Sequence, residues 1–339
     1  MGLVREPDVL AWSDASFELR PEDSLRSGLE PPFRRTFFPL GYSVEIIANE
    51  PDVLLAAGES FGHVATLRQA TPFEVRVDVS EREGAGAVCP PEPMRRAFNH
   101  LFLLVADAQN QAVLDFRTGA NFTWITRGAL SNHLYFRSNF LEKVVYLLLG
   151  ASVVTDLHAA CVGRNGKGIL LCGRSGAGKS TLAYACARAG WTYTSDDTSY
   201  LIDDSEIPRV IGHCHRARFR PAARDLFPEL VGRALTPRME GKPSIEIPIS
   251  ELPVEHRTAE ATIHAVVFLN RHDGADGKFA ELPRGSATER LRQELYSTGE
   301  IRERHERLLG ALWDMPAFEL HYWNLDDGVM ALDRLLQTI

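Results

Sequence analysis

Five runs in the first half of the chain are rich in apolar and β-branched residues, and most of them alternate these with polar ones, the period of two that is typical of half-buried strands. Turn signals such as Thr118-Gly119 and Arg127-Gly128 separate neighbouring runs. Residues 1–36 are rich in Pro, Arg and Glu without clear periodicity, and we expect an irregular leader there. From residue 37 we predict a small sheet with the strands Tyr42–Ala48, Phe73–Val79, Leu101–Ala106, Ala112–Arg117 and Phe122–Thr126.

The pattern changes to helical spacing after this sheet. Between Ala129 and Gly150 apolar residues recur close to every three or four positions, and Gly150 stands where a helix-ending glycine would. The spacing predicts one long helix that packs between two domains. We place the boundary near residue 150, so that residues 37–150 form an α+β domain.

Residues 151–339 follow the order strand, glycine turn, strand, glycine loop, helix and strand, as in α/β nucleotide-binding domains. Further on we predict a charged helix over Thr288–Leu309, a strand over Phe318–Trp323 and a closing helix over Asp326–Leu336. The predicted fold class is therefore α/β, with the smaller α+β domain in front.

Composition places the chain among folded proteins, since 45% of its 339 residues are hydrophobic and 24% are charged. The net charge of −8 gives no positive field for a nucleic-acid backbone or an anionic membrane, and we expect neither as a partner. The five cysteines are scattered without a C-x-x-C pair, which favours reduced thiols. The longest apolar candidate, Val144–Thr155, has 12 uncharged residues, short of the roughly 20 that a membrane helix needs. We expect a cytoplasmic protein.

A complete G-x-x-x-x-G-K-[ST] motif lies between an apolar strand and a helix-forming run. Small residues let successive N–H groups converge on a β-phosphate, while Lys179 reaches the β- and γ-oxygens. Ser180 offers a hydroxyl to Mg²⁺, and the motif predicts ATP and Mg²⁺ as cofactors. A glycine-rich turn without a ligand is the alternative. The candidate cofactor-binding residues are Gly173, Arg174, Ser175, Gly176, Ala177, Gly178, Lys179, Ser180 and Thr181.

Two adjacent carboxylates, Asp196 and Asp197, end the next predicted strand. The carboxyl end of a strand next to the phosphate loop faces the same crevice, so one carboxylate can hold Mg²⁺ while the other accepts a proton. The alternative is a solvated Asp-Asp turn. His158 lies on the apolar run Thr155–Val162, where a histidine alone is more often a hydrogen-bonded core residue than a functional one.

These residues together resemble the catalytic domain of HPr kinase/phosphorylase. The resemblance covers residues 155–200 and rests on Leu157-His158-Ala159, the Gly173-x-Ser175-Gly176-x-Gly178-Lys179-Ser180 loop and Asp196-Asp197. It implies the phosphoenolpyruvate-carboxykinase-like variant of the P-loop fold and transfer of a γ-phosphoryl group to a serine hydroxyl.

The resemblance also implies roles for the matching residues. Asp196 would be the general base, oriented by His158, while Ser180 and Asp197 would hold Mg²⁺; which aspartate is base and which is ligand stays open. This chain has Thr181 where the family has an acidic residue, and it lacks the family's long glycine-containing signature after the aspartates. It resembles instead the HPr-kinase-like proteins encoded beside bacterial peptide-modification and polysaccharide genes, which implies a peptide or protein acceptor. Family members form hexamers, so a homo-oligomer is also left open.

Two further segments carry candidates for a clamp on the transferred phosphate. On a strand, Arg216, Arg218 and Arg220 would share one face, as phosphate ligands or as a ladder paired with acidic neighbours. Lys242 stands on a glycine-proline loop that could close over the γ-phosphate. A metal site at His213-Cys214-His215 is disfavoured because adjacent strand residues point to opposite faces.

The sequence thus favours a Mg-ATP-dependent kinase acting on a serine of a peptide or protein. Two alternatives stay open. One is a kinase for a small sugar or alcohol, and the other is a non-catalytic, ATP-gated binding protein. A pure switch would need no base, and the carboxylate pair therefore favours an enzyme.

Overall fold

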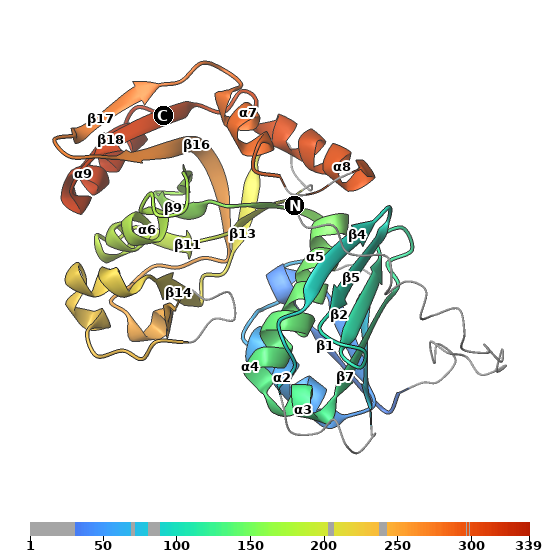
Figure 1. Ribbon diagram of the computed structural model, residues 1–339. Coiled ribbons are helices and arrows are strands. Elements are labelled where there is room, and N and C mark those ends of the chain that lie inside the picture. The colour runs from blue at the N-terminus through green and yellow to red at the C-terminus, as the bar shows by residue number, and fades with distance from the viewer. Residues whose placement is uncertain are drawn as a thin grey trace, which may run out of the picture.

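The computed structural model describes residues 31–68, 72–80, 89–202, 207–236, 243–295, 297 and 299–339. Over these residues the chain is a mixed α/β protein with two main sheets, one in each half of the chain. Figure 1 shows the two sheets with helices packed against them. None of the described helices is long and apolar enough to cross a membrane.

The first sheet has seven strands in the order β1-β2-β3-β7-β6-β5-β4. They are β1 (Phe33–Phe37), β2 (Val44–Ala48), β3 (Phe73–Ser80), β4 (Met94–Phe98), β5 (Leu101–Val105), β6 (Gln111–Asp115) and β7 (Asn121–Thr126). β2, β3 and β7 run parallel at the centre, and the other neighbours pair antiparallel. All five predicted strands are present.

Three elements of this half were missed. Residues 33–36, assigned to the leader, form most of edge strand β1, which pairs with β2; residues 1–30 lie outside the described part of the chain. The β1 residues are mostly exposed, so the sequence FRRTF carries little apolar periodicity. Strand β4 is exposed along its whole length, so it too lacks the apolar periodicity that would have predicted it. Helix α2 (Pro51–Phe61) begins with a proline in its first turn and buries Val53, Ala56 and Ala57.

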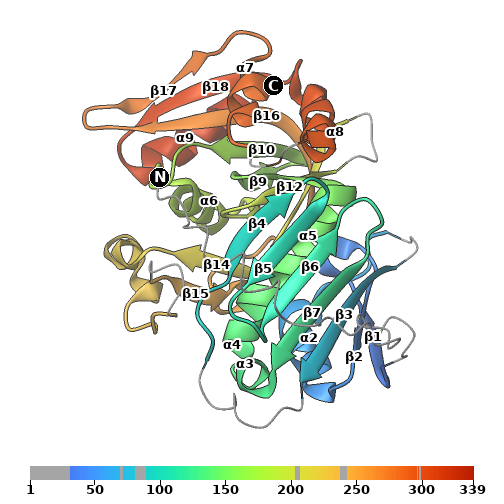
Figure 2. The same ribbon diagram turned by 45° about the vertical axis from the view of Figure 1, so that its right-hand side comes forward.

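The helix predicted over residues 129–150 is present but is broken once, at Asn132: α3 (Arg127–Ser131) precedes the break, and α4 (His133–Phe136), a π-helical turn (Arg137–Leu141) and α5 (Glu142–Ser152) follow it without interruption. The Asn132 side chain accepts a hydrogen bond from the Tyr135 N–H at 3.1 Å and so begins a new helix. Gly150 lies inside α5. Figure 2 shows α5 behind the strands of the first sheet, and Tyr146 of α5 stacks on Tyr200 of the second sheet with ring centroids 5.9 Å apart.

The second sheet has nine strands, in the main order β11-β9-β10-β16-β13-β12-β8, with β18 and then β17 continuing beside β16. β10, β16 and β18 are parallel neighbours, whereas β9 lies antiparallel between β10 and β11. β10 and β11 therefore end at the same edge without being adjacent. The strands are β8 (Val154–Leu157), β9 (Ala160–Arg164), β10 (Lys167–Cys172), β11 (Thr192–Ser195), β12 (Ser199–Ile202), β13 (Arg209–Gly212), β16 (Glu260–Arg271), β17 (Asp276–Glu281) and β18 (Ala317–Tyr322).

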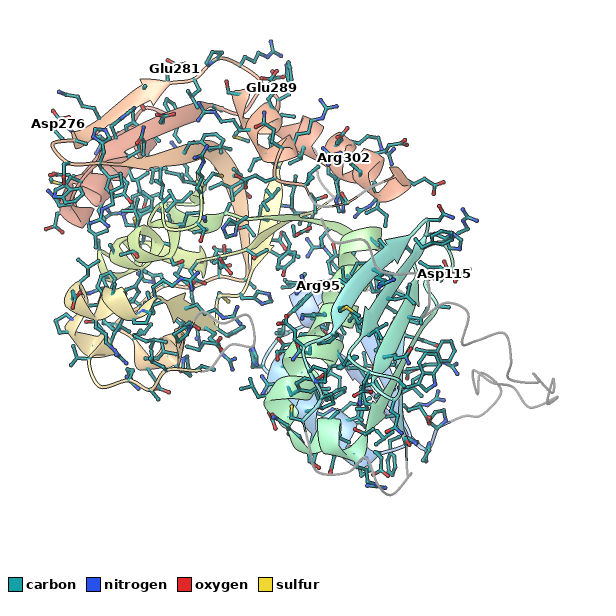
Figure 3. The ribbon with its side chains drawn as sticks, in the orientation of Figure 1. Arg95, Asp115, Asp276, Glu281, Glu289 and Arg302 are labelled. Carbon is teal, nitrogen blue, oxygen red and sulfur yellow. The ribbon has the colours of Figure 1, made fainter. Side chains whose placement is uncertain are left out.

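Helices cover both faces of this sheet. α6 (Lys179–Arg188) and α9 (Leu325–Leu336) pack on one face, and α7 (Ser286–Arg292) and α8 (Gly299–Leu309) pack on the other. The helical stretch predicted over Thr288–Leu309 is present as two helices, α7 and α8, rather than as one. Gly299, with φ of 59°, begins α8. Figure 3 labels Glu289 on α7 and Arg302 on α8, two of the charged residues that make this stretch resemble one solvated helix.

A small two-stranded sheet of β14 (Arg216–Phe219) and β15 (Ile245–Pro248) packs beside α6. Tyr184 of α6 makes an edge contact with Phe219 of β14, with ring centroids 5.0 Å apart. The contact anchors β14 close to the end of β11. Five short 3₁₀ turns complete the described elements: Pro39–Gly41, Pro221–Asp225, Pro228–Leu230, Ile249–Glu251 and Gly310–Leu312.

Candidate functional site

The phosphate-binding motif forms a tight loop between β10 and α6. Gly176 and Gly178 have φ values of 89° and 99°, which side-chain-bearing residues rarely adopt. A Cβ atom on Gly178 would also lie 2.7 Å from the Tyr322 hydroxyl, so glycine is required there for space as well. The same hydroxyl donates a hydrogen bond to the Ala177 carbonyl at 3.3 Å. The loop is therefore fixed against the end of β18, while the side chains of Arg174 and Ser175 are exposed.

Lys179 is almost completely buried at the start of α6. Its ammonium group donates hydrogen bonds to the Gly173 carbonyl at 2.6 Å and to the Arg174 carbonyl at 3.5 Å. Burial lowers the lysine pKa, and the nearby Asp197 carboxylate partly offsets this shift. A buried cation beside the N-terminus of a helix is suited to an anionic ligand such as a phosphate chain.

Ser180 connects the loop helix to the carboxylate pair, because its hydroxyl donates to the Asp196 main-chain carbonyl at 3.0 Å. The Asp196 side chain is buried, and its Oδ2 atom accepts the Arg218 main-chain N–H at 2.9 Å. Burial raises the Asp196 pKa to about 7, against the opposing effect of that hydrogen bond; the Asp197 charge adds to the rise. Asp197, in contrast, keeps 47% of its side chain exposed. The two neighbours thus differ in burial, which raises the pKa of Asp196 and suits it to proton transfer, while the exposed Asp197 is suited to bind a ligand.

His158 lies in a bend between β8 and β9, where the sequence predicted one continuous strand. The break arises because β8 pairs with β12 whereas β9 pairs with β10 and β11. The His158 side chain is 43% exposed, and its Nδ1 atom lies 3.6 Å from Asp197 Oδ1. His158 is therefore not a core residue, and its carboxylate neighbour is Asp197 rather than the expected Asp196.

The arginine strand lies against the carboxylate pair, although its side chains are engaged elsewhere. Arg218 Nε lies 2.9 Å from Glu246 Oε1 on β15, and Arg216 Nη1 lies 3.6 Å from Glu246 Oε2. These two arginines form the acid-paired ladder that the sequence left as an alternative, and Arg220 follows the end of β14. Lys242 lies outside the described residues.

The contact of the Arg218 N–H with Asp196 is a feature that sequence reasoning missed. Tyr322, which holds the loop from 145 positions away, was missed as well. Neither contact has a signal in the sequence, because each depends on how distant strands pack. Within the described residues, no group of three or more His, Cys, Asp or Glu side chains is placed to hold a metal ion.

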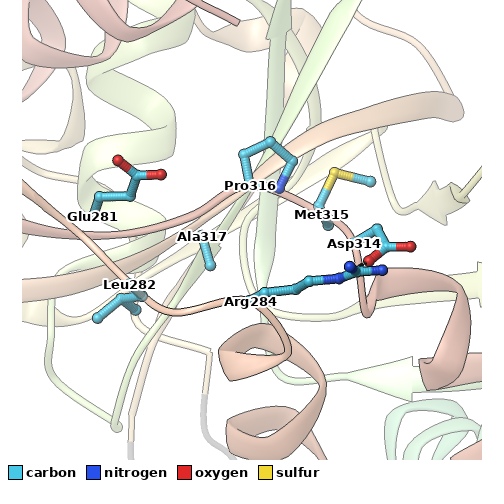
Figure 4. Close-up of a pocket in the computed structure, with 7 residues that line it drawn as sticks. All are labelled: Glu281, Leu282, Arg284, Asp314, Met315, Pro316 and Ala317. Atoms are coloured by element: carbon cyan, nitrogen blue, oxygen red, sulfur yellow. Dashed lines mark ion pairs between the residues drawn. The ribbon is translucent and has the colours of Figure 1, made fainter.

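A cavity lined by residues of β17, β18 and the neighbouring loops is separate from the phosphate loop. Its volume is about 460 Å³, and an Arg284–Asp314 ion pair crosses its lining (Figure 4). The lining includes Glu281 at the end of β17 and Ala317 at the start of β18. Because β18 runs parallel to β16 and β16 to β10, the start of β18 lies at the sheet edge opposite to the loop.

No family model matches this chain, and no curated protein does. Among solved structures, the chain is similar to the HPr(Ser) kinase/phosphatase from Coxiella burnetii. The match has 12% sequence identity, covers 55% of this chain and 99% of that protein, and has a TM-score of 0.29. At so low a TM-score the likeness says nothing about activity, and the chemistry of the site has to be inferred from its own residues.

Proposed function

We propose that this protein is a Mg-ATP-dependent kinase that transfers the γ-phosphoryl group to a serine hydroxyl of a peptide or protein. One observation carries the proposal: the Ser180 hydroxyl joins the phosphate-loop helix to the Asp196 main chain, so that phosphate ligands and carboxylates meet at one edge of the sheet. A phosphoryl-transfer site needs these two groups of residues side by side.

The loop residues 173–178 and Lys179 would hold the phosphates. The N–H groups of the glycine-rich turn and the first turn of α6 provide donors, and the Lys179 ammonium provides the charge. Its two carbonyl partners are neutral, so the ammonium can exchange one of them for a phosphate oxygen. Arg174, Ser175 and Thr181 border this position.

Ser180 and Asp197 fit Mg²⁺. The ion favours hard oxygen ligands and usually takes one or two from the protein and the rest from phosphates and water. A hydroxyl beside the loop and a half-exposed carboxylate provide that donor set, and Asp197 is also the carboxylate whose charge acts on Lys179. Bound Mg²⁺ would neutralise charge on the transferring phosphoryl group. His158, 3.6 Å from Asp197, would hold this carboxylate in place.

Asp196 is the proposed general base. The Arg218 N–H donates to its Oδ2 atom at 2.9 Å and the Tyr193 hydroxyl also hydrogen-bonds the carboxylate, so the group is held in place to accept the proton of the acceptor hydroxyl. His158 and Asp197 are each close to half exposed, so an acceptor larger than a metabolite can reach the site from solvent. A serine of a peptide or protein, the acceptor class implied by the resemblance, fits such an open site.

The experiment is incubation of γ-labelled ATP and Mg²⁺ with a lysate of the source cells and either wild-type protein or Asp196→Asn. Products are separated by mass. We expect label in a peptide or protein band with the wild type alone. Asp225→Asn, an exposed aspartate on the Pro221–Asp225 turn, is the matched control and keeps full transfer.

Three outcomes would change the proposal. Label confined to low-mass fractions would select a small-molecule kinase, and nucleotide-dependent capture of a partner without transfer would select an ATP-gated binding protein. If Asp196→Asn transfers at the wild-type rate, Asp196 is not the base. A Mg²⁺ titration of Asp196→Asn and Asp197→Asn separates the roles, because loss of a metal ligand raises the Mg²⁺ concentration required, whereas loss of a base lowers kcat at saturating Mg²⁺.

A further inference from the structure

The order of strands around the phosphate loop indicates on which side of the loop the nucleoside part of ATP would lie. The carboxylates follow β11, on one side of β10, and β16 and β18 end on the other side. If the β-phosphate lies in the loop and the γ-phosphate faces Asp196 and Asp197, the nucleoside must leave towards the ends of β16 and β18. The surface at these two ends is therefore where a nucleobase would lie.

An exposed aromatic and an arginine are paired at that place. Arg271 is the last residue of β16 and Trp323 directly follows β18. The Arg271 guanidinium lies over the indole ring, 5.1 Å from its centroid, and the Arg271 Nε–H donates to the Trp323 carbonyl at 2.9 Å. Arg271 is exposed, and Trp323 keeps 46% of its surface exposed. A tryptophan exposed to this extent on a charged surface leaves ring area available for a ligand.

The pair is held at a fixed position relative to the loop. Arg271 is opposite Tyr322 in the β16–β18 ladder, and the Tyr322 hydroxyl donates to the loop carbonyl of Ala177 at 3.3 Å. The His272 N–H donates to the Tyr322 carbonyl at 3.1 Å and fixes the chain after β16. Trp323 is therefore one residue away from a direct contact with the phosphate loop.

We infer that the Arg271–Trp323 pair is the nucleobase subsite, where the purine ring of ATP stacks. The inference rests on the proposed function, since it takes the position of the γ-phosphate from it. Both the indole ring and the guanidinium plane are suited to the π-face of a purine. Stacking recognises that face rather than the hydrogen-bonding edge, so the subsite would accept guanine as well as adenine.

The test compares a ligand that has a base with one that has none. MgATP and Mg-tripolyphosphate are titrated calorimetrically into wild-type protein, Trp323→Ala, Trp323→Phe and Arg271→Lys. Trp323→Ala should weaken ATP binding roughly 5- to 150-fold and leave tripolyphosphate binding unchanged. Trp323→Phe keeps an aromatic face and should retain most of the affinity. Arg271→Lys keeps the charge, loses the planar group, and should weaken ATP alone by a smaller factor.

Phe98→Ala, at an exposed aromatic on β4 of the other sheet, is the control and should bind both ligands as the wild type does. Unchanged ATP affinity in both Trp323→Ala and Arg271→Lys would overturn the subsite and leave the proposed kinase intact. Equal loss of both ligands would also overturn it, because the defect would then lie in the loop. A wild-type protein that binds neither ligand would remove the proposed function, and the subsite with it.

Discussion

The two halves of the protein, each built around one sheet, differ in which polar side chains they bury. Among the described residues, the buried polar side chains of the first half are neutral: Asn110, Asn121, Thr123, Thr126 and Asn139. In the second half the buried polar set also includes the ionisable residues Lys179, Asp196 and His305, and the first two belong to the proposed site. Burial of a charge costs stability unless the charge is compensated. On the proposed function, a bound phosphate chain and a metal ion would offset this cost in the second sheet.

Replacement of Lys179 should have the largest effect. Lys179→Met removes the buried charge, and we expect phosphoryl transfer to fall roughly 100- to 1,000-fold, as for other single electrostatic groups at a transition state. The unfolding temperature of the ligand-free protein should not fall, since burial disfavours the lysine cation there. Label transfer and a thermal melt measure the two effects. Lys167→Met, at the start of β10, where the ammonium donates to the Leu336 and Ile339 carbonyls, is the control and should keep transfer.

Asp196 should give the next largest effect, in the stability of the metal-free protein. Its pKa is raised from 3.8 to about 7, so between these values the folded state keeps a proton that the unfolded state has lost. Stability therefore falls as pH rises from about 4 to 7, by an amount on the order of a few kcal/mol. Asp196→Asn should abolish this slope and be more stable than the wild type at pH 8. Urea unfolding of both proteins in EDTA at pH 5 and pH 8 measures the change in stability with pH. The same change in Asp196→Asn as in the wild type would show that Asp196 is already ionised at pH 5.

Within the proposed site, the sequence predicts the parts that are local in the chain but not the contacts between distant segments. The loop of residues 173–180 is contiguous, so its strand, turn and helix could be predicted from local spacing. The Asp196–Arg218 and Gly178–Tyr322 contacts join segments that are distant in sequence, and no local pattern encodes them. His158 shows the same limit, since its bend exists because β8 and β9 pair with different strands.

The junction between the halves provides a third test, with the opposite pH dependence. His213 makes edge contacts with Tyr146 of α5 and Tyr200 of β12, and burial, reinforced by Arg218 and other cations, lowers its pKa to about 4. The unfolded state then binds more protons between about pH 4 and 6.5, so stability falls as pH falls through this window. His213→Phe keeps the ring packing and should reduce this loss. The measurement is thermal unfolding between pH 7 and pH 5.

His256→Phe serves as the control for that experiment, because His256 is exposed and makes no ring contact in the described structure. It should leave the acid sensitivity unchanged. A His213→Phe protein that loses as much stability in acid as the wild type would assign the effect to other groups.

The smallest effect is expected from the neutral network of the first sheet. The Asn110 carbonyl oxygen accepts the Thr126 main-chain N–H at 2.9 Å and the Thr126 hydroxyl at 3.2 Å. Asn110→Ala leaves both donors buried without a partner, which should lower the free energy of unfolding by about 1–3 kcal/mol. Because the residue belongs to the sheet without buried charge, transfer per folded molecule and MgATP affinity should equal those of the wild type. Denaturant unfolding and calorimetry on the same samples provide the measurement, and a drop in MgATP affinity would mean that the two sheets are coupled more tightly than the distribution of their buried charges indicates.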